Sequence, residues 1–312
     1  MKTLIGIDVG GTNLRIGVVE YNDQKRTPLL LEEMRFQADF SKLCKMHINN
    51  PQLAWQYIVV TIANAIQTVR AKYPAISAVG IGFPGFIEPK TQKIVQSPNL
   101  PGLSMVDLSA ALSQQIGLPV VIENDALAAA YGEFVSGTNV TQDLIYLGLG
   151  TGVGGGLILN GKPYQGQRGV AMEVGHIIVT PHGRQCGCGN QGCMEKYASA
   201  SGVAMSYFES TGQQCHAEEI ATRAAQGDAA AITAYALAGE SLAKALAHIL
   251  KVIDVSHLVI GGGMSAAWPL MAQSFNQTLE QDLIPVLRNQ VRVHISTMGD
   301  QAGVIGAAML AL

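Results

Sequence analysis

Three cysteines lie close together in the middle of this chain, in a segment that begins and ends with glutamate. Residues 173–195 read E-V-G-H-I-I-V-T-P-H-G-R-Q-C-G-C-G-N-Q-G-C-M-E and hold three of the chain's five cysteines: Cys186, Cys188 and Cys193. Glycines separate the cysteines, so the backbone can turn tightly enough to bring three sulfurs together. With one histidine, His176 in preference to His182, they would form a tetrahedral ligand set for zinc. Such a closed set leaves no position for a reactive water, so it predicts a structural zinc ion.

A disulfide is the main alternative for these cysteines. Cys186 and Cys188 are too close in sequence to pair easily with each other. Elsewhere the chain has only Cys44 and Cys215, which gives an odd total and a poor framework for a secreted protein. A redox C-x-x-C motif is absent from the sequence. Zinc is therefore the favoured interpretation, and the free thiols predict a cytoplasmic location.

The glutamates at the two ends of the segment are not needed by the metal. Glu173 and Glu195 offer carboxylate oxygens that a polyhydroxyl ligand could use. Asn99 and Asn124, earlier in the chain, add amide donors and acceptors. The alternative is that both glutamates are ordinary surface residues. Their positions on either side of a rigid metal site favour a binding role instead.

Two turns rich in glycine and threonine have the composition of phosphate-binding loops. The first comprises Asp8, Gly10, Gly11, Thr12 and Asn13, and the second comprises Gly148, Gly150, Thr151, Gly152 and Gly154. Backbone N–H groups and threonine hydroxyls in such turns can hold phosphate oxygens, because the missing Cβ lets a ligand approach. Asp8, at the end of a strand, is well placed to hold Mg²⁺ through water. A third glycine run follows a later strand: Gly261, Gly262 and Gly263.

An ordinary hairpin turn would explain any one of these loops equally well. Two loops of the same form about 140 residues apart, with the third glycine run, favour ATP as the ligand. The lysine of a P-loop is missing from both. A dinucleotide-binding motif fits poorly, because its glycines should open a helix and here they lie between strands.

Asp125 is the candidate for proton transfer. It follows a short apolar strand and precedes a helix. Its simplest role would be to cap that helix, which contributes about 1 kcal/mol and needs no catalysis. An aspartate at the carboxyl end of a strand could instead take a proton from a substrate hydroxyl that attacks the γ-phosphate of ATP. The sequence position alone does not choose between these roles.

The expected elements place these residues in a mixed α/β fold. Residues 3–20 and 143–161 each predict two strands joined by a glycine turn. Further strands are predicted at 76–82, 119–123 and 257–264, and helices at 53–72, 107–116, 126–134, 217–251 and 302–312. The last helix is rich in small residues and is predicted to be buried. The repeated strand–turn–strand unit predicts two related lobes that face one cleft.

The composition excludes several classes of function. With 312 residues, of which 48% are hydrophobic and 14% charged, the chain can bury a large core. A net charge of −3 without a cluster of lysine or arginine argues against nucleic acid as a partner. The apolar run at the amino terminus is too short for a signal peptide before Asp8 interrupts it. No uninterrupted apolar stretch approaches the ~20 residues of a membrane span, so no membrane association is expected.

Together these motifs resemble the ROK family of bacterial sugar kinases and repressors, within the actin-like ATPase superfamily. The resemblance covers the whole chain, from D-V-G-G-T-N-L-R through P-N-L, I-E-N-D-A, L-G-T-G-V-G-G-G, E-V-G-H and C-G-C-G-N-Q-G-C-M-E to V-I-G-G-G. The cysteine motif is highly specific, whereas a lone Gly-Gly-Thr turn is not. The resemblance implies two actin-like (ribonuclease H-like) lobes, with ATP between the glycine loops and the sugar in the cleft between the lobes. We expect an amino-terminal lobe over residues 1–122, to which the helix at 301–312 returns, and a carboxyl-terminal lobe over 123–300 with a zinc loop at 176–193.

The resemblance also implies roles for individual residues. Asp125 corresponds to the catalytic base of the family. The sugar contacts correspond to Asn99, Asn124, Asp125, Glu173, His176 and Glu195, and the loop around Gly85 lies near them. His176 would both bind zinc and contact the sugar, which selects it over His182. A homodimer is usual in the family.

The expected function is ATP- and Mg²⁺-dependent phosphorylation of a hexose, at the 6-position and with glucose as the first candidate. Fructose, allose, mannose and N-acetylhexosamines are alternatives that one sequence does not distinguish. A sugar-sensing protein without catalytic activity is the alternative from a different class. The family's repressors carry an amino-terminal DNA-binding domain, for which no room is expected before Asp8. The intact Asp-x-Gly-Gly-Thr motif also favours a kinase.

Overall fold

The protein has a mixed α/β fold, as the sequence predicts. A computed structural model describes residues 1–10, 12–24, 27–137 and 141–312. Gly11, a predicted phosphate contact, lies outside the described residues. The chain divides into two compact units, and each is described by itself. Unit 1 comprises residues 1–142, 156–171 and 300–312, and unit 2 comprises residues 143–155 and 172–299.

Unit 1 contains most of the strands of the amino-terminal half of the chain. Its strands are β1 (Lys2–Val9), β2 (Asn13–Tyr21), β3 (Leu29–Gln37), β4 (Ile76–Phe83), β5 (Phe86–Ile87), β6 (Ile94–Gln96), β7 (Ser104–Val106), β8 (Val120–Asn124) and β11 (Lys162–Pro163). Its helices are α1 (Phe40–Met46), α2 (Pro51–Lys72), α3 (Leu108–Ile116), α4 (Asp125–Ser136) and α10 (Gln301–Leu310). The strands β1, β2, β3, β4 and β8 form one sheet in the order β3-β2-β1-β4-β8, and β5, β6 and β7 form a smaller one.

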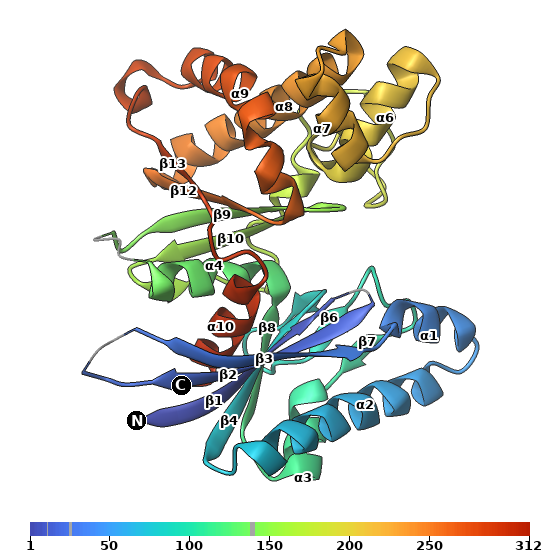
Figure 1. Cartoon of the computed structure of the whole chain (residues 1–312), viewed down its shortest axis with the longest axis vertical. Helices are drawn as coiled ribbons and strands as arrows, with labels where there is room; N and C mark the ends of the chain where they lie inside the picture. Colours follow the sequence, from blue (N-terminus) through green and yellow to red (C-terminus); the bar gives the residue numbers. More distant parts are fainter. Residues whose placement is uncertain (11, 25–26, 138–140) are drawn as a thin grey trace. The chain divides into compact units, whose positions relative to one another are not determined.

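The main sheet of unit 1 has helices on both faces. Strand β1 pairs antiparallel with β2 and parallel with β4, which in turn pairs parallel with β8. Side chains alternate between the faces of a strand. Ile5 and Ile7 of β1 are buried in the same core cluster as Ile58 and Ile62 of α2. Figure 1 shows α2 and α3 on one side of these strands and α10 on the other.

Helix α10 packs against the opposite face of the sheet through glycines. A Cβ on Gly6 of β1 would lie 1.8 Å from the carbonyl oxygen of Val304, and one on Gly80 of β4 would lie 1.7 Å from that of Ala307. Only glycine allows the helix backbone to approach the strands so closely. The predicted burial of this helix of small residues is therefore confirmed, since Ala302 through Met309 are buried.

Unit 2 combines a small parallel core of strands with most of the helices of the second half of the chain. Its strands are β9 (Leu144–Leu149), β12 (His257–Gly261) and β13 (Arg292–Ile295), with the first part of β10 (Val153–Leu159). Its helices are α5 (Glu195–Ala198), α6 (Ala200–Thr211), α7 (Ala217–Ala225), α8 (Ala229–Ile253) and α9 (Trp268–Asp282), with 3₁₀ turns at Val174–His176, Gly263–Ala267 and Pro285–Leu287. The sheet order is β11-β10-β9-β12-β13, and β12 pairs parallel with β9 and with β13.

The predicted elements are found at the expected positions, with two refinements. The strand predicted at 257–264 ends at Gly261, before a 3₁₀ turn that begins at Gly263. The helix-rich segment 217–251 is two helices, α7 and α8. Asp228 precedes α8 and caps it, because its side chain accepts hydrogen bonds from Ala230 N–H and Ala231 N–H. Helices α6 and α9 were not predicted. The division of the chain into lobes at residue 123 stays a prediction. Among the described residues, no helix combines the length and apolar character that crossing a lipid bilayer requires.

Candidate functional site

The three clustered cysteines and His176 come together in unit 2. Their possible ligand atoms all lie within 4.8 Å of one another. His176 Nδ1 lies 3.6 Å from Cys186 Sγ, and Cys188 Sγ lies 3.6 Å from Cys193 Sγ. All five cysteines of the chain are free thiols. His182, the alternative ligand, is not a member of the cluster.

The geometry of this cluster fits zinc. In a tetrahedral site with Zn–S bonds of about 2.3 Å and a Zn–N bond of about 2.0–2.1 Å, two sulfurs lie about 3.8 Å apart, and a sulfur and a nitrogen about 3.6 Å apart. The separations in the cluster, both 3.6 Å, are close to these values. Burial raises the pKa of the Cys193 thiol to about 12, so a bound metal would have to displace its proton. The donor set is closed, as a structural site requires.

Backbone hydrogen bonds shape the loop that carries the cysteines. Cys186 N–H donates to the carbonyl oxygen of Asn190 over 2.9 Å, which closes a tight turn around Cys188. Gly192 has a φ of 82°, and a Cβ there would lie 1.7 Å from the carbonyl oxygen of Thr180. Glycine is therefore required at this position for the chain to return to Cys193. These local bonds and glycines thus bring the three cysteines of the loop together.

Glu173 and His176 lie on the same short turn. The Oε2 atom of Glu173 is 3.9 Å from Nε2 of His176, the ring nitrogen that faces away from the cysteines. Burial raises the pKa of the Glu173 carboxyl, and nearby His176 opposes that rise. Metal-ligating histidines usually give their second ring N–H to a carboxylate or a carbonyl oxygen. The turn can therefore fix the ring orientation of His176.

Glu195 is held against the glycine turn between β9 and β10. Its Oε2 accepts a hydrogen bond from Val153 N–H over 3.0 Å. A Cβ on Gly152 would lie 2.6 Å from the same oxygen, so the glycine makes room for the carboxylate. This contact was not predicted, because 42 residues separate the two partners. It joins the end of the cysteine segment to a predicted phosphate loop.

A cavity of about 570 Å³ opens beside the same glycine turn in unit 2. Gly150 and Thr151 of the predicted phosphate loop line one part of it, and Gly263 and Met264 line another. The remaining wall comes mainly from α7, α8 and the 3₁₀ turn that begins at Gly263: His216, Ala217, Glu218, Ala221, Tyr235, Ala266 and Ala267. This volume lies in the range of small-molecule sites. The two predicted glycine loops of unit 2 therefore meet at one cavity.

The glycine runs around this cavity adopt special backbone geometry. Gly150 N–H donates to the carbonyl oxygen of Gly152 over 2.9 Å, which closes the turn. Gly262 has a φ of 79°, and a Cβ there would lie 2.4 Å from the carbonyl oxygen of Leu149. Gly261 ends β12, and Gly154 lies within β10. Of these predicted contacts, Gly150, Thr151 and Gly263 border the cavity.

Asp8 lies at the end of β1 in unit 1, beside the first glycine–threonine turn. Burial raises the pKa of its carboxyl to about 6, and the charge of Asp125 adds to that rise. Arg15 opposes it with Nη1 at 3.5 Å from Oδ2 of Asp8. In the turn itself, Gly10 N–H donates to the carbonyl oxygen of Asn13 over 2.9 Å, and the side chain of Asn13 donates to Thr12. Two partly desolvated carboxylates near one another favour a bound cation.

Asn124, and not Asp125, caps α4. The side-chain oxygen of Asn124 accepts from Leu127 N–H over 3.0 Å, and its amide donates to the carbonyl oxygen of Gly85 over 3.2 Å. Asp125 is the first residue of the helix, and its Oδ1 accepts from Ala126 N–H over 2.9 Å. The capping role that the sequence allowed for Asp125 therefore belongs to its neighbour. Asp125 shares its surroundings with Asp8, whose pKa it raises.

Asn99 lies on an exposed turn after β6, near the same loop. Ser97, two residues earlier, is buried and donates a hydrogen bond to the carbonyl oxygen of Pro84. The loop at Gly85 is thus tied to the turn of Asn99 by Ser97 and to α4 by Asn124. The predicted association of Asn99, Asn124 and the Gly85 loop is consistent with these bonds.

Glu123 is a buried residue of unit 1 that sequence reasoning missed. Only 4% of it is exposed, and burial raises the pKa of its carboxyl. One carboxylate oxygen accepts from Asn124 N–H over 2.8 Å, and the other accepts from the amide of Gln165. A charged residue in the otherwise apolar strand V-V-I-E-N was the available signal, because such residues are rarely buried without a partner. Glu123 therefore fixes the backbone just before Asp125.

Comparison with known proteins identifies the family. The sequence matches the ROK family over residues 4–312. Glucokinase from Streptomyces coelicolor is 31% identical over 330 residues, which cover 100% of this chain and 98% of that one. N-acetyl-D-glucosamine kinase from Salmonella typhimurium is 33% identical over 320 residues, which cover 98% of each chain. A crystal structure of a ROK family glucokinase from Streptomyces griseus, in complex with glucose and AMPPNP, is similar with a TM-score of 0.77 and 31% identity over 99% of each chain.

These similarities extend over nearly the whole chain and are not limited to one motif. They confirm the predicted actin-like α/β fold and the resemblance drawn from the sequence motifs. The chain belongs to the ROK family.

Proposed function

We propose that this protein is an ATP-dependent hexose kinase. The observation that carries the proposal is the similarity, over 99% of both chains, to a glucokinase that was crystallised with glucose and AMPPNP. A cavity beside a glycine–threonine turn and a pair of interacting aspartates, Asp8 and Asp125, support the same chemistry. Phosphoryl transfer depends mostly on positioning and on charge stabilisation, which such groups provide.

The nucleotide would occupy the cavity of unit 2. The N–H group and the hydroxyl of Thr151 would hold phosphate oxygens, Gly150 would let them approach the backbone, and the apolar wall near Tyr235 would receive the base. In unit 1, Thr12 would offer a further hydroxyl for phosphate, and Gly10 would leave room for the ligand to approach the turn. Asp8 would hold Mg²⁺ through water, and a bound Mg²⁺ neutralises charge on the transferred phosphoryl group.

Asp125 would act as the general base. It would accept the proton of the sugar hydroxyl as the oxygen attacks the γ-phosphate, and the hydroxyl at the 6-position is the expected acceptor. Asn124 caps the helix and leaves Asp125 free of that task. Glu123 would keep the preceding backbone in place through its bond to Asn124 N–H.

The sugar would be bound by Asn99, Asn124, Asp125, Glu173, His176 and Glu195. One carboxylate oxygen of Glu195 accepts a hydrogen bond from Val153 N–H, and the other would bind a sugar hydroxyl. His176 would bind zinc through Nδ1 and present its Nε2–H to Glu173 or to the sugar. The zinc ion, held by His176, Cys186, Cys188 and Cys193, would be structural.

Glucose is the first candidate for the sugar. N-acetylglucosamine is a second candidate, because a kinase for it is 33% identical to this chain. Fructose, mannose and allose remain to be compared by assay. A homodimer and a cytoplasmic location are expectations from the family and from the free thiols, and size-exclusion chromatography tests the first of them.

The test is an ADP-release assay with ATP, Mg²⁺ and a panel of hexoses. We expect turnover with at least one hexose, and Asp125→Asn should lower kcat by about 10² to 10⁴ while sugar affinity changes little. Sugar binding without ADP release from any hexose would favour a sugar-sensing protein. Near-normal kcat in Asp125→Asn would contradict the role of Asp125.

A further inference from the structure

One arginine anchors the cysteine loop to two helices of unit 2. Arg184 donates through Nε to Glu209 Oε1 over 3.1 Å, and through Nη2 to Glu209 Oε2 over 2.6 Å and to Ser206 Oγ over 2.9 Å. Its Nη1 donates to the carbonyl oxygens of Lys196 over 2.7 Å and Gly202 over 3.1 Å. Only 14% of the side chain is exposed. All five N–H donors of the guanidinium therefore have partners.

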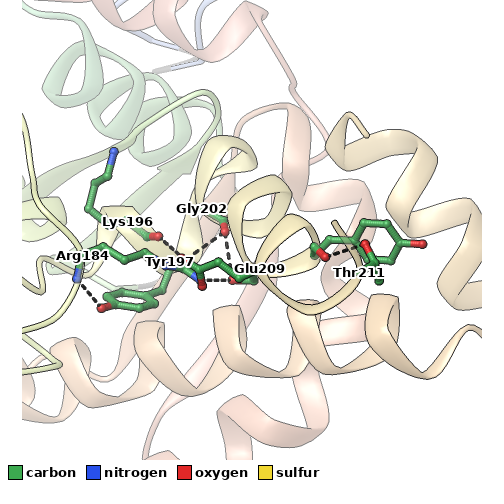
Figure 2. A network of polar contacts seen from close by, with 8 residues as sticks. Arg184, Lys196, Tyr197, Gly202, Glu209 and Thr211 are labelled. Atoms are coloured by element: carbon green, nitrogen blue, oxygen red, sulfur yellow. Dashed lines mark hydrogen bonds and ion pairs between the residues drawn. The ribbon is translucent and has the colours of Figure 1, made fainter. Parts of the chain in front are cut away.

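Tyr197 holds the same arginine from the other side. Figure 2 shows the side chain of Arg184 next to the Tyr197 ring, and the guanidinium carbon lies 4.6 Å from the ring centroid. The Tyr197 hydroxyl accepts from Arg184 N–H over 3.0 Å. A planar guanidinium can stack and donate in its plane at once, whereas a lysine ammonium cannot. The arrangement is thus specific for arginine.

The residues that Arg184 holds also support the proposed nucleotide loop. Between Lys196 and Gly202 the chain passes from α5 to α6. There Ala200 N–H donates to the carbonyl oxygen of Gly150 over 2.9 Å, and Ser201 Oγ donates to that of Thr151 over 3.0 Å. Arg184 binds the carbonyl oxygens on both sides of this joint. The backbone of the nucleotide loop is therefore supported by a joint that one arginine fixes.

Arg184 is also connected to the cysteine cluster. Arg184 is two residues from Cys186, and its own carbonyl oxygen accepts from Gly192 N–H over 2.8 Å, next to Cys193. A metal that holds these two cysteines together fixes the loop from which Arg184 reaches the helices. Without the metal, the three thiols would hold the loop only by weak hydrogen bonds, such as the 3.6 Å contact between Cys188 Sγ and Cys193 Sγ.

We propose that Arg184 is a positioning residue that couples metal binding at the cysteine cluster to nucleotide binding at Gly150 and Thr151. The proposal rests on the nucleotide site of the proposed function. Coupling between two ligands is reciprocal, so metal raises nucleotide affinity by the same factor as nucleotide raises metal affinity. The route consists of Arg184, the α5–α6 joint and the β9–β10 turn, all within unit 2.

Calorimetric titration with AMPPNP and Mg²⁺ tests the coupling without turnover. Zinc-loaded wild-type protein should bind AMPPNP about tenfold more tightly than protein stripped of zinc by a chelator that is then removed. Arg184→Lys, loaded with one zinc per chain, should bind AMPPNP about tenfold more weakly than the wild type. In Arg184→Lys, zinc removal should change AMPPNP affinity less than twofold, because the residue that couples the two sites has already been replaced.

Two variants serve as controls. Arg70→Lys removes an arginine bond to the carbonyl oxygen of Ile116 in unit 1, and it should leave AMPPNP affinity and its zinc dependence unchanged. Glu209→Gln keeps the bonds from Arg184 to Lys196 and Gly202, so it should weaken AMPPNP binding less than Arg184→Lys does. Normal AMPPNP affinity in zinc-loaded Arg184→Lys, or an equal effect of zinc removal in that variant and the wild type, overturns the proposal.

A second measurement needs no variant. The zinc affinity of the wild type, determined by competition with a chromogenic chelator, should rise about tenfold in saturating AMPPNP and Mg²⁺. Equal zinc affinity with and without bound AMPPNP overturns the coupling, while the kinase proposal stands. If the wild type binds no AMPPNP at all, the proposed function itself fails, and the two results are therefore distinguishable.

Discussion

At the scale of single residues, Asn124 has the helix-capping role that the sequence had allowed for Asp125. Asn124 caps α4 and holds the Gly85 loop, so Asn124→Ala should lower the free energy of unfolding by about 1 kcal/mol. It should also raise KM for the sugar, because the carbonyl oxygen of Gly85 loses its hydrogen bond from the Asn124 side chain. Urea unfolding and steady-state kinetics measure the two effects.

A matched capping variant separates stability from binding. Asp107 caps α3 by accepting from Ala110 N–H over 2.9 Å, in the same unit. Asp107→Ala should lose a similar free energy of unfolding without a change in KM for the sugar. Equal KM in both variants would show that Asn124 acts only as a cap.

Asp8 gives a prediction about pH. Its carboxyl has a pKa of about 6 in the folded protein and an ordinary value of 3.8. Because the folded state holds this proton more tightly, Asp8 favours folding at low pH, and that contribution is lost as the pH rises through 6. Asp8→Asn should therefore raise the free energy of unfolding at pH 7.5 by about 1–3 kcal/mol, and by less at pH 4.5.

The measurement is urea unfolding without nucleotide and with a chelator present, so that no cation offsets the charge of Asp8. Arg15 keeps an ion pair with Asp300 at 2.8 Å in the variant, so it is not left without a partner. A variant that is less stable than the wild type at both pH values would contradict the prediction.

The parts of the candidate site that lie close together in the sequence could be predicted from it, whereas contacts between distant segments could not. The proposed zinc ligands lie within one short segment, and their residue types define the chemistry, so the cluster was predictable. The bond from Val153 N–H to Glu195 and the bonds of Arg184 to α5 and α6 were not, because they join residues that no spacing rule connects. Glu123 carried only the weak signal of a charge within an apolar strand.

At the scale of elements, we expect the loop from His176 to Cys193 to depend on the proposed zinc ion. Irregular backbone with few apolar contacts has little stability of its own. Removal of zinc should lower the free energy of unfolding by about 4 kcal/mol, if free zinc had been 1,000 times its dissociation constant. It should also weaken sugar binding, since His176, Glu173 and Glu195 are attached to the loop. Thermal unfolding and sugar titration, with zinc quantified by atomic absorption, measure both.

Cysteine variants provide the control for that experiment. Cys193→Ser should reproduce the effects of zinc removal, whereas Cys44→Ser and Cys215→Ser should retain one zinc per chain, because they lie outside the cluster. A zinc-free protein with unchanged sugar affinity would refute the idea that the metal supports the sugar contacts.

The elements themselves were predictable where local pattern decides them. The strand–turn–strand units and α3, which runs from its cap Asp107 to Gly117 with a φ of 68°, carry signals in adjacent residues. Helices α6 and α9 were missed. Their apolar faces are defined by packing on α8, for example by the close approach of Gly239 to the carbonyl oxygen of Met271. In α9 the buried residues Met271, Phe275 and Leu279 also recur every four residues, so a helical signal was present in the sequence and was not used.

At the scale of the whole molecule, the chain completes unit 1 only with its last helix. The unit begins at Met1, and α10 returns from residue 300 to cover β1 and β4. Folding of this unit must therefore bring together segments about 300 residues apart, which is an entropically costly closure. The sequence predicted a buried helix of small residues, but only the structure shows which glycines of the sheet this helix packs against.

Substitution of those glycines tests whether α10 holds unit 1 together. A Cβ at Gly80 would collide with the carbonyl oxygen of Ala307, and a helix backbone cannot shift locally, so Gly80→Ala should cost about 3 kcal/mol or more. Gly82→Ala on the same strand is the control, because its Cβ would lie 3.3 Å from a methyl carbon of Ala128 and should cost much less. Hydrogen exchange resolved along the chain should show the lost protection in β1, β4 and α10, with the cysteine loop of unit 2 still protected. Equal stability of the two variants, or loss of protection that begins in unit 2, would mean that α10 does not close the fold in this way.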